Sequence, residues 1–386
     1  MCLDGSASEY FDAAIARGRM PHLMELSAHG YRGLARSALP SFTNTNNASI
    51  VTGLPPSGHG ISGNFFIDPD SGKEVMMNSA RYLRADTILA GAANSGRRVA
   101  AVTAKDKLRQ MLAHKLDGIA FSAENAGDAR RATHGIDDVP GFVGAPIPDI
   151  YSAEASLFVL RAGVALLKRG EADFLYLSTT DYIQHKHRPE DTVALDFYAA
   201  IDEQIGEIIS LGARLGITAD HGMNDKQLSD GSPNVIYLES ELEPEFGRSF
   251  RVILPITDPY VKHHGSFGSC ATIHLADGVD TVAFRTRVTA LRGITEVHDR
   301  DSAARLLELP ADRIGDLVVL SGRDSVVGCS PRHHEISSVG NLRSHGGRYE
   351  EMVPFLVSES LNNDYFGRAG GDVRNFDIFD FTINGG

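Results

Sequence analysis

Two stretches of the chain decide the fold: Leu175-Tyr176-Leu177-Ser178-Thr179-Thr180-Asp181 and Gly216-Ile217-Thr218-Ala219-Asp220-His221-Gly222. Each starts as a short apolar run, which predicts a buried strand, and then becomes polar. Residues 98–103 form a further predicted strand. Between the two quoted stretches, residues 191–211 place apolar side chains on one face of a predicted helix, namely Leu195, Tyr198, Ile201, Ile205 and Ile208. The order strand, helix, strand predicts an α/β fold with a mostly parallel sheet wrapped by helices.

The polar residues that follow the two strands are candidates for an active site, because ligands bind at the carboxyl ends of parallel strands. Asp181 and His185 are four residues apart, so a helical turn after the first strand places both side chains on one face. Asp220 and His221 follow the second strand. Carboxylate and imidazole ligands suit zinc, with manganese and iron as alternatives. A single pair of this kind is more often a helix cap or a turn, but two pairs at two strand ends favour a metal site.

Three residues from other parts of the chain are candidates for the same site. Asp4 follows the apolar start of the chain, as expected at the end of a first strand. His345 is followed by two glycines, which permit close backbone approach, although an ordinary loop histidine is the alternative. Thr43 lies in a polar turn that leads into a predicted helix, where backbone N–H groups favour an anion. The alternative is that Thr43 or Thr45 only caps that helix.

Composition narrows the class of protein. The 386 residues carry a net charge of −13 and no basic patch, which argues against nucleic-acid binding. A small anion must therefore be attracted by local charge, and a metal ion is the first candidate. The cysteines are widely spaced, which argues against a disulfide framework. Because no apolar run approaches the roughly 20 residues that span a bilayer, and no signal peptide is visible, we expect a cytoplasmic protein that binds no membrane.

The pattern of predicted elements changes near residue 226. From there to about residue 329 the chain has short strand-like pieces, more prolines and charged helices such as residues 302–307. We therefore predict a catalytic core made of residues 1–225 and 335–386, with a smaller α+β cap domain, residues 226–334, inserted between them.

Taken together, these motifs resemble the alkaline phosphatase superfamily, and are most similar to its nucleotide pyrophosphatase/phosphodiesterase branch and to the phosphonoacetate hydrolases. The specific parts are Asp4-Gly5, Thr43 with residues 49–53 and 57–61, Asp181 with His185, Asp220-His221-Gly222, and His345-Gly346. The resemblance implies a central sheet sandwiched by helices, two zinc ions per chain, and a homodimer. It makes Asp181, His185 and His345 the ligands of one zinc, and Asp4, Thr43, Asp220 and His221 the ligands of the other. Only three residues precede Asp4, fewer than a full first strand, so we expect a shortened strand there and a weaker second zinc site if that strand is incomplete.

The resemblance also implies the chemistry. Thr43 would be the metal-activated nucleophile that attacks phosphorus, or would only position the substrate while a metal-activated hydroxide attacks. Asn64 would donate a hydrogen bond to a phosphoryl oxygen. Lys105 and Lys107 resemble the paired lysines that bind a substrate carboxylate, although two lysines at this spacing are more often a solvated surface. The expected reaction is hydrolysis of the carbon–phosphorus bond of phosphonoacetate to acetate and phosphate. The alternatives are a phosphodiesterase or phosphomonoesterase that acts on a small organic or nucleotide ester, and a zinc-binding protein without activity.

Overall fold

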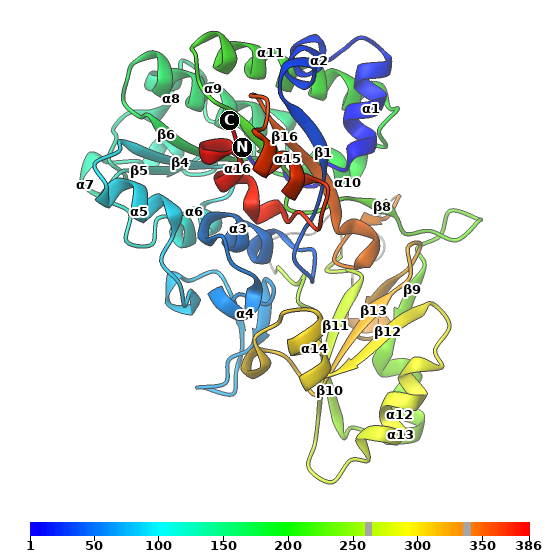
Figure 1. Ribbon diagram of the computed structural model, residues 1–386. Helices are drawn as coiled ribbons and strands as arrows, with labels where there is room; N and C mark the ends of the chain where they lie inside the picture. Colours follow the sequence, from blue (N-terminus) through cyan, green and yellow to red (C-terminus); the bar gives the residue numbers. More distant parts are fainter. Residues whose placement is uncertain (259–264, 335–340) are drawn as a thin grey trace.

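The computed structural model describes residues 1–258, 265–334 and 341–386, and its largest element is a central sheet (Figure 1). One half of the sheet has the strand order β5-β4-β6 and the other β7-β16-β1. The bounds are β1 (Tyr31–Arg36), β4 (Val99–Thr103), β5 (Ile119–Ser122), β6 (Phe174–Ser178), β7 (Gly216–Thr218) and β16 (Met352–Val357). β4 pairs in parallel with β5 and β6, whereas β16 runs antiparallel to β7 and β1. The predicted α/β class with a mostly parallel sheet is confirmed.

The first three residues join the two halves of the sheet. Cys2 bridges in parallel to Ser178 of β6 and to Thr218 of β7. Its N–H donates to the carbonyl of Leu177 at 2.7 Å, and the N–H of Leu3 donates to the carbonyl of Thr218 at 2.8 Å. The segment before Asp4 is short, as expected, yet it hydrogen-bonds to both neighbouring strands. Asp4 is therefore fixed beside the ends of β6 and β7.

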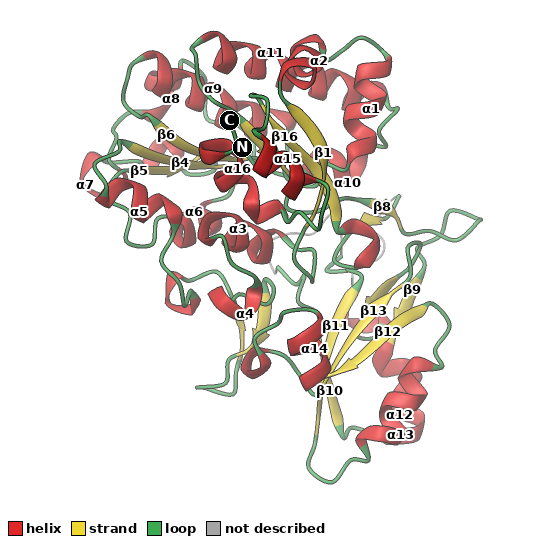
Figure 2. Cartoon of the chain, in the orientation of Figure 1, coloured by secondary structure: helices red, strands yellow, loops and turns green. Residues whose placement is uncertain are grey.

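Helices cover both faces of the sheet, and the alternation of side chains along β4 explains why (Figure 2). Ala100 and Val102 face one apolar cluster, whereas Val99 and Ala101 face another. The first face carries α1 (Ser8–Ala16), α2 (Pro21–His29), α8 (Val139–Val143), α9 (Ala153–Lys168) and α11 (Thr192–Ser210). The second face carries α3 (Thr43–Thr52), α5 (Ile88–Asn94), α6 (Asp106–Leu112), α15 (Asn363–Ala369) and α16 (Ile378–Asn384). Among the described residues, no helix combines the length and the apolar content that crossing a bilayer requires.

A second, antiparallel sheet of order β10-β11-β13-β12 forms the lower lobe of Figure 1. Its strands are β10 (Phe250–Ile253), β11 (Cys270–Leu275), β12 (Ile294–Asp299) and β13 (Leu317–Ser321), and helices α12 (Leu238–Phe246), α13 (Thr281–Thr289) and α14 (Arg300–Leu306) accompany them. The hairpin of β2 (Phe65–Ile67) and β3 (Glu74–Met76) reaches this lobe, because the N–H of Asn64 donates to the carbonyl of Pro255 at 2.7 Å. All elements of the second sheet lie within the predicted cap. The domain boundaries themselves stay a prediction, and residues 335–340 lie outside the described part of the chain.

A buried ion pair connects Lys226, at the start of the predicted cap, to Glu350 of the predicted core. The Lys226 ammonium lies 2.8 Å from a carboxylate oxygen of Glu350, and both side chains are fully buried. The other carboxylate oxygen of Glu350 accepts from the N–H of Gly347 at 3.1 Å, and its backbone carbonyl accepts from the N–H of Gly222 at 2.7 Å. One acidic residue thus holds together the loops that carry His221 and His345.

Replacing Lys226 by Met should lower the free energy of unfolding by about 3–5 kcal/mol, because it leaves the buried Glu350 carboxylate without its counter-charge. Chemical denaturation of the purified protein measures this loss. Lys168→Met is the matched control, since its ammonium pairs with Glu207 at 2.6 Å on the exposed surface, where a pair contributes about 0–1 kcal/mol. Equal losses in the two variants would contradict the assignment of Glu350 as a buried fastening point.

Candidate metal centre and active site

The first group of candidate ligands gathers at the end of β6. Asp181 directly precedes α10 (Tyr182–Lys186), so that His185 follows one helical turn later. The Nε2 atom of His185 lies 2.9 Å from Oδ2 of Asp181, and the Nε2 atom of His345 lies 3.8 Å from the same oxygen. The three side chains are buried, and their ligand atoms lie within 4.8 Å of one another. The structure therefore brings together the three residues predicted for one zinc ion.

The second group surrounds His221 at the end of β7. Its Nε2 atom lies 3.2 Å from Oδ1 of Asp4, 3.8 Å from Oδ2 of Asp220 and 3.4 Å from Oγ1 of Thr43. Oδ2 of Asp181 is also only 4.0 Å from this nitrogen. The four residues predicted for the second zinc ion thus lie together, and Asp181 stands between the two groups.

Two glycines make this convergence sterically possible. Gly5 has φ +67°, a left-handed conformation, and a Cβ atom there would lie 2.8 Å from Cβ of Asp181. Gly346 has φ +112°, and a Cβ atom there would lie 2.2 Å from the ring of Phe42. Each glycine directly follows a candidate ligand, so the chain can turn away without displacing the neighbouring side chains.

Backbone carbonyls orient all three histidines in the same way. The Nδ1–H group of each ring donates at 2.8 Å to a carbonyl, that of Arg343 for His185, Gly222 for His221 and Ser41 for His345. Because a carbonyl only accepts, Nδ1 of each ring carries a proton, and Nε2 is the atom that points toward the carboxylates and could bind a metal ion. Orientation by such partners is typical of histidines that bind metal.

The charges of the centre call for a cation. Burial raises the pKa of the Asp4 carboxyl well above its usual range, and the carboxylates of Asp181 and Asp220 raise it further. Neither oxygen of Asp4 has a hydrogen-bond partner among the described residues. Burial alone would lower the pKa of His221, but the three carboxylates around it raise that pKa to about 10. Buried carboxylates and imidazoles in this arrangement could hold a metal ion, and their oxygen and nitrogen donors are of the kind that zinc accepts.

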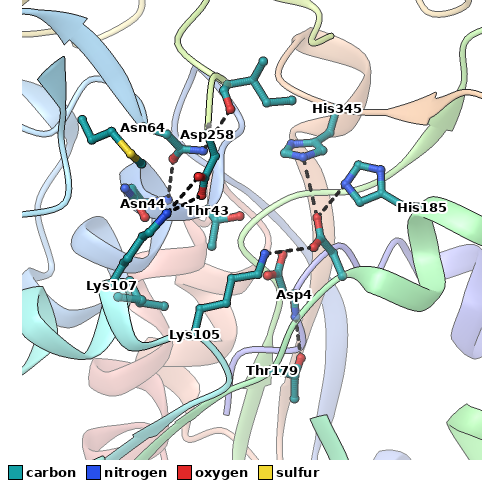
Figure 3. Close-up of a pocket in the computed structure, with 14 residues that line it drawn as sticks. Asp4, Thr43, Asn44, Asn64, Lys105, Lys107, Thr179, His185, Asp258 and His345 are labelled. Carbon is teal, nitrogen blue, oxygen red and sulfur yellow. Dashed lines mark hydrogen bonds and ion pairs between the residues drawn. The ribbon is translucent and has the colours of Figure 1, made fainter. Parts of the chain in front are cut away.

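The remaining predicted residues line the pocket in front of these groups (Figure 3). Thr43 is the first residue of α3, so its hydroxyl lies at a helix N-terminus. The side-chain oxygen of Asn64 lies 3.4 Å from the N–H of Asn44. The Lys105 ammonium lies 3.5 Å from Oδ1 of Asp181, and Lys107 also lines the pocket. The two lysines are thus part of the pocket wall and not a solvated surface.

The structure adds residues that the sequence did not reveal. Asp258 binds the Lys107 ammonium through both carboxylate oxygens, at 2.9 and 3.1 Å, and lines the same pocket. It comes from the lower lobe, and no local pattern marks it. Asn47 donates from Nδ2 to Oδ2 of Asp220 at 3.3 Å and to the carbonyl of Thr43 at 3.0 Å. The sequence signal that could have identified Asn47 is its position one helical turn after Thr43.

Known proteins resemble this chain in sequence and in fold. The model of the family described as type I phosphodiesterase / nucleotide pyrophosphatase matches residues 1–348. The chain is similar to the phosphonoacetate hydrolase of Sinorhizobium meliloti 1021, solved in complex with phosphonoformate and with phosphonoacetate, at 46% identity and a TM-score of 0.94, covering 100% of this chain and 94% of that one.

More distant relatives agree on the fold. Murine ectonucleotide pyrophosphatase / phosphodiesterase 5 has a TM-score of 0.64 at 15% identity, covering 98% of this chain and 92% of that one. An uncharacterised pyrophosphatase/phosphodiesterase of Schizosaccharomyces pombe is 38% identical over 75 residues, which span 19% of this chain and 15% of that protein. The chain belongs to the type I phosphodiesterase / nucleotide pyrophosphatase family, a family of hydrolytic enzymes.

Proposed function

We propose that the protein hydrolyses the carbon–phosphorus bond of phosphonoacetate, giving acetate and phosphate, with two zinc ions bound. The observation that carries the proposal is one pocket lined by the hydroxyl group of Thr43 and by two lysines, beside the Asp/His groups. A phosphate ester offers the lysines no carboxylate to bind. The similarity to a phosphonoacetate hydrolase at 46% identity supports the same substrate.

The zinc ligands in this proposal are the residues of the two groups. Asp181, His185 and His345 hold one ion, and Asp4, Thr43, Asp220 and His221 hold the other. When bound, the ions supply Lewis-acid charge that stabilises negative oxygen on the nucleophile and on the phosphonate. The structure's carboxylates and its oriented Nε2 atoms support this assignment.

Thr43 carries the bond-making step. Its Oγ1 atom loses its proton to solvent water and attacks phosphorus, and the bond between phosphorus and carbon breaks. The electron pair of that bond leaves with the carbon and delocalises into the carboxylate as an enolate, which takes a proton from solvent water to become acetate. Water then cleaves the phosphoryl group from Thr43, which releases phosphate and restores the hydroxyl. In this proposal the N–H groups at the start of α3 and the Nδ2–H group of Asn64 donate to phosphoryl oxygens, and the Asn64 donor would leave the carbonyl of Ile256, which lies 3.5 Å away.

The lysines make the carbon a better leaving group. In the enolate, negative charge accumulates on the carboxylate oxygens, and the ammonium groups of Lys105 and Lys107 stabilise that charge. Their effect is strong because Lys105 and Lys107 are both largely shielded from water, with side chains 29% and 30% exposed.

Phosphate release tests the proposed substrate. Zinc-loaded protein should turn over phosphonoacetate, measured as phosphate released, with a higher kcat/KM than p-nitrophenyl phosphate or bis-(p-nitrophenyl) phosphate, both measured as p-nitrophenol released. A preference for either ester would overturn the proposed substrate and would favour a phosphomonoesterase or phosphodiesterase.

Lys107→Met tests how the carboxylate is recognised. The variant keeps the length of the side chain but removes the charge, so kcat/KM for phosphonoacetate should fall about 10- to 100-fold, the range expected for a lost hydrogen bond to a charged group. Turnover of p-nitrophenyl phosphate, which has no carboxylate, should change little. An equal loss for both substrates would show that Lys107 acts on the structure of the pocket and not on the carboxylate.

Asp258→Asn changes the other partner of the ion pair between Lys107 and Asp258. It keeps an oxygen that can accept from Lys107 but removes a negative charge from a pocket that must bind an anion. We expect the KM for phosphonoacetate to fall by about 3- to 10-fold. Repulsion between the Asp258 carboxylate and the negatively charged substrate in the same pocket costs on the order of 1 kcal/mol after screening. A higher KM would contradict this charge argument.

A further inference from the structure

A second cluster of metal-ligand residues lies in the lower lobe of Figure 1, on elements that do not line the active site. Glu239 is in the first turn of α12, Cys329 directly follows β14 (Val326–Gly328), and His333 ends the short helix η4 (Pro331–His333). One ligand atom of each residue lies within 4.8 Å of those of the other two. Three different potential zinc ligands thus meet from two segments, α12 and residues 329–333.

The backbone holds all three residues in place. The N–H of Glu239 donates to the carbonyl of Cys329 at 2.9 Å, which fixes α12 against the end of β14. The N–H of His333 donates to the carbonyl of Ser330 at 2.9 Å, which closes the turn between Cys329 and His333. A site whose ligands are already positioned loses little conformational entropy when an ion binds.

One carboxylate oxygen of the cluster is left unsatisfied. Oε2 of Glu239 is buried and has no hydrogen-bond partner among the described residues, although it lies 3.2 Å from Nδ1 of His333. A carboxylate oxygen without a hydrogen bond also lies close to a histidine nitrogen in the candidate active site. There, Oδ1 of Asp4 lies 3.2 Å from Nε2 of His221. A separation of 3.2 Å between the two atoms suits two ligands of one zinc ion, each about 2 Å from it.

An ordinary Glu–His ion pair is the simpler alternative, and the chain contains one for comparison. Glu296 and His298 form a hydrogen bond of 2.8 Å, and Arg348 completes the charge balance of that glutamate. The cluster around Cys329 differs in two respects. First, it contains the thiol of Cys329, whose hydrogen-bond contact is a backbone carbonyl 3.8 Å away. Second, the Oε2 atom of Glu239 lacks a hydrogen bond. The Ser330 hydroxyl also lies 3.0 Å from Nδ1 of His333, so it must turn away if that nitrogen binds an ion.

We propose that Glu239, Cys329 and His333 bind one further zinc ion, separate from the catalytic pair. A thiolate, an imidazole and a carboxylate form a ligand set typical of zinc and unsuited to magnesium or calcium, which take oxygen ligands. His333 is half exposed, so a solvent molecule can take the fourth position. The ion would tie α12 to the segment that leads toward His345, and would therefore stabilise the lower lobe.

Binding at this cluster must displace a proton. Burial and the carboxylates of Glu239 and Glu74 raise the pKa of the Cys329 thiol to about 12, so the thiol is protonated when no ion is present.

Cobalt(II) binding to the full chain tests the proposal, because a thiolate bound to cobalt gives a near-ultraviolet charge-transfer band that Asp and His ligands do not give. The protein is stripped with a chelator, titrated with Co²⁺ or Zn²⁺, desalted, and analysed for bound metal by mass spectrometry. We expect a thiolate band and one equivalent of metal more in the wild-type protein than in Cys329→Ser. His333→Ala, a change at a half-exposed side chain, should lose the same equivalent and should also weaken the band.

His298→Gln is the control, since it removes a histidine from the ordinary Glu–His pair, and it should keep the wild-type metal content and band. Activity toward phosphonoacetate should persist in Cys329→Ser, which separates this site from the catalytic one. The proposal is wrong if no thiolate band appears, or if the band and the metal content are the same in Cys329→Ser as in the wild-type protein. A band that persists in Cys329→Ser would assign the thiolate to Cys2 or Cys270.

Discussion

Thr43→Ala should reduce phosphonoacetate turnover by at least about 10³-fold, because it removes the only atom proposed to form a bond with phosphorus. The loss should appear in kcat, since the charges that attract the substrate remain. The bound zinc should stay close to the wild-type content, because six of the seven proposed ligands are unchanged. Steady-state kinetics and metal analysis of the same preparation measure both quantities.

Thr43→Ser is the matched control. It keeps the hydroxyl at the N-terminus of α3 and removes only a methyl group, so it should retain a substantial part of the activity. If Thr43→Ala keeps normal turnover, the threonine is not the nucleophile, and direct attack by water becomes the better description. If both variants lose activity together with their zinc, Thr43 acts mainly as a ligand.

Asp181→Asn should weaken zinc binding by at least about 100-fold, more than the 10- to 100-fold typical for residues that only orient a ligand. Among the described residues, Asp181 is the one carboxylate within 4.0 Å of the Nε2 atoms of His185, His345 and His221, so its change affects both groups. Turnover should fall with metal content. Chelator competition followed by metal analysis measures the affinity.

Asp202→Asn is the control for removing a buried carboxylate elsewhere. Asp202 accepts hydrogen bonds from the N–H groups of His22 and Leu23 at 3.0 and 2.8 Å, between α11 and α2. Its variant should lose some stability and keep both zinc ions. An Asp181→Asn protein that still held two zinc ions with unchanged affinity would contradict the role assigned to Asp181.

Local patterns in the sequence were sufficient for the elements that carry the main ligands. The helical repeat predicted for residues 191–211 corresponds to α11, and the predicted strands before Asp181 and Asp220 correspond to β6 and β7. These predictions succeeded because apolar periodicity is a property of neighbouring residues. The first three residues are too few for such a pattern. Their place between β6 and β7 depends on hydrogen bonds to residues about 175 and 215 positions away.

The same distinction applies to the site. The four-residue spacing of Asp181 and His185 can be recognised in the sequence. The resemblance to a known family identified Thr43, Asn64 and the two lysines as candidate site residues. Asp258 and Glu350 act through contacts with Lys107 and Lys226 that no spacing encodes. Their roles follow from how the lower lobe meets the core, and only the three-dimensional arrangement contains that information.

The position of β16 in the sheet has a consequence for the synthesis of the protein. Tyr31 of β1 pairs with Val357 of β16, and β7 pairs with the other edge of β16. A nascent chain therefore holds an unpaired β1 until residues 352–357 have been synthesised, whereas the sheet of β10 to β13 draws on one continuous segment, residues 250–321. We expect the pairing of β1 with β16 to be a late step of folding, because it joins segments about 320 positions apart.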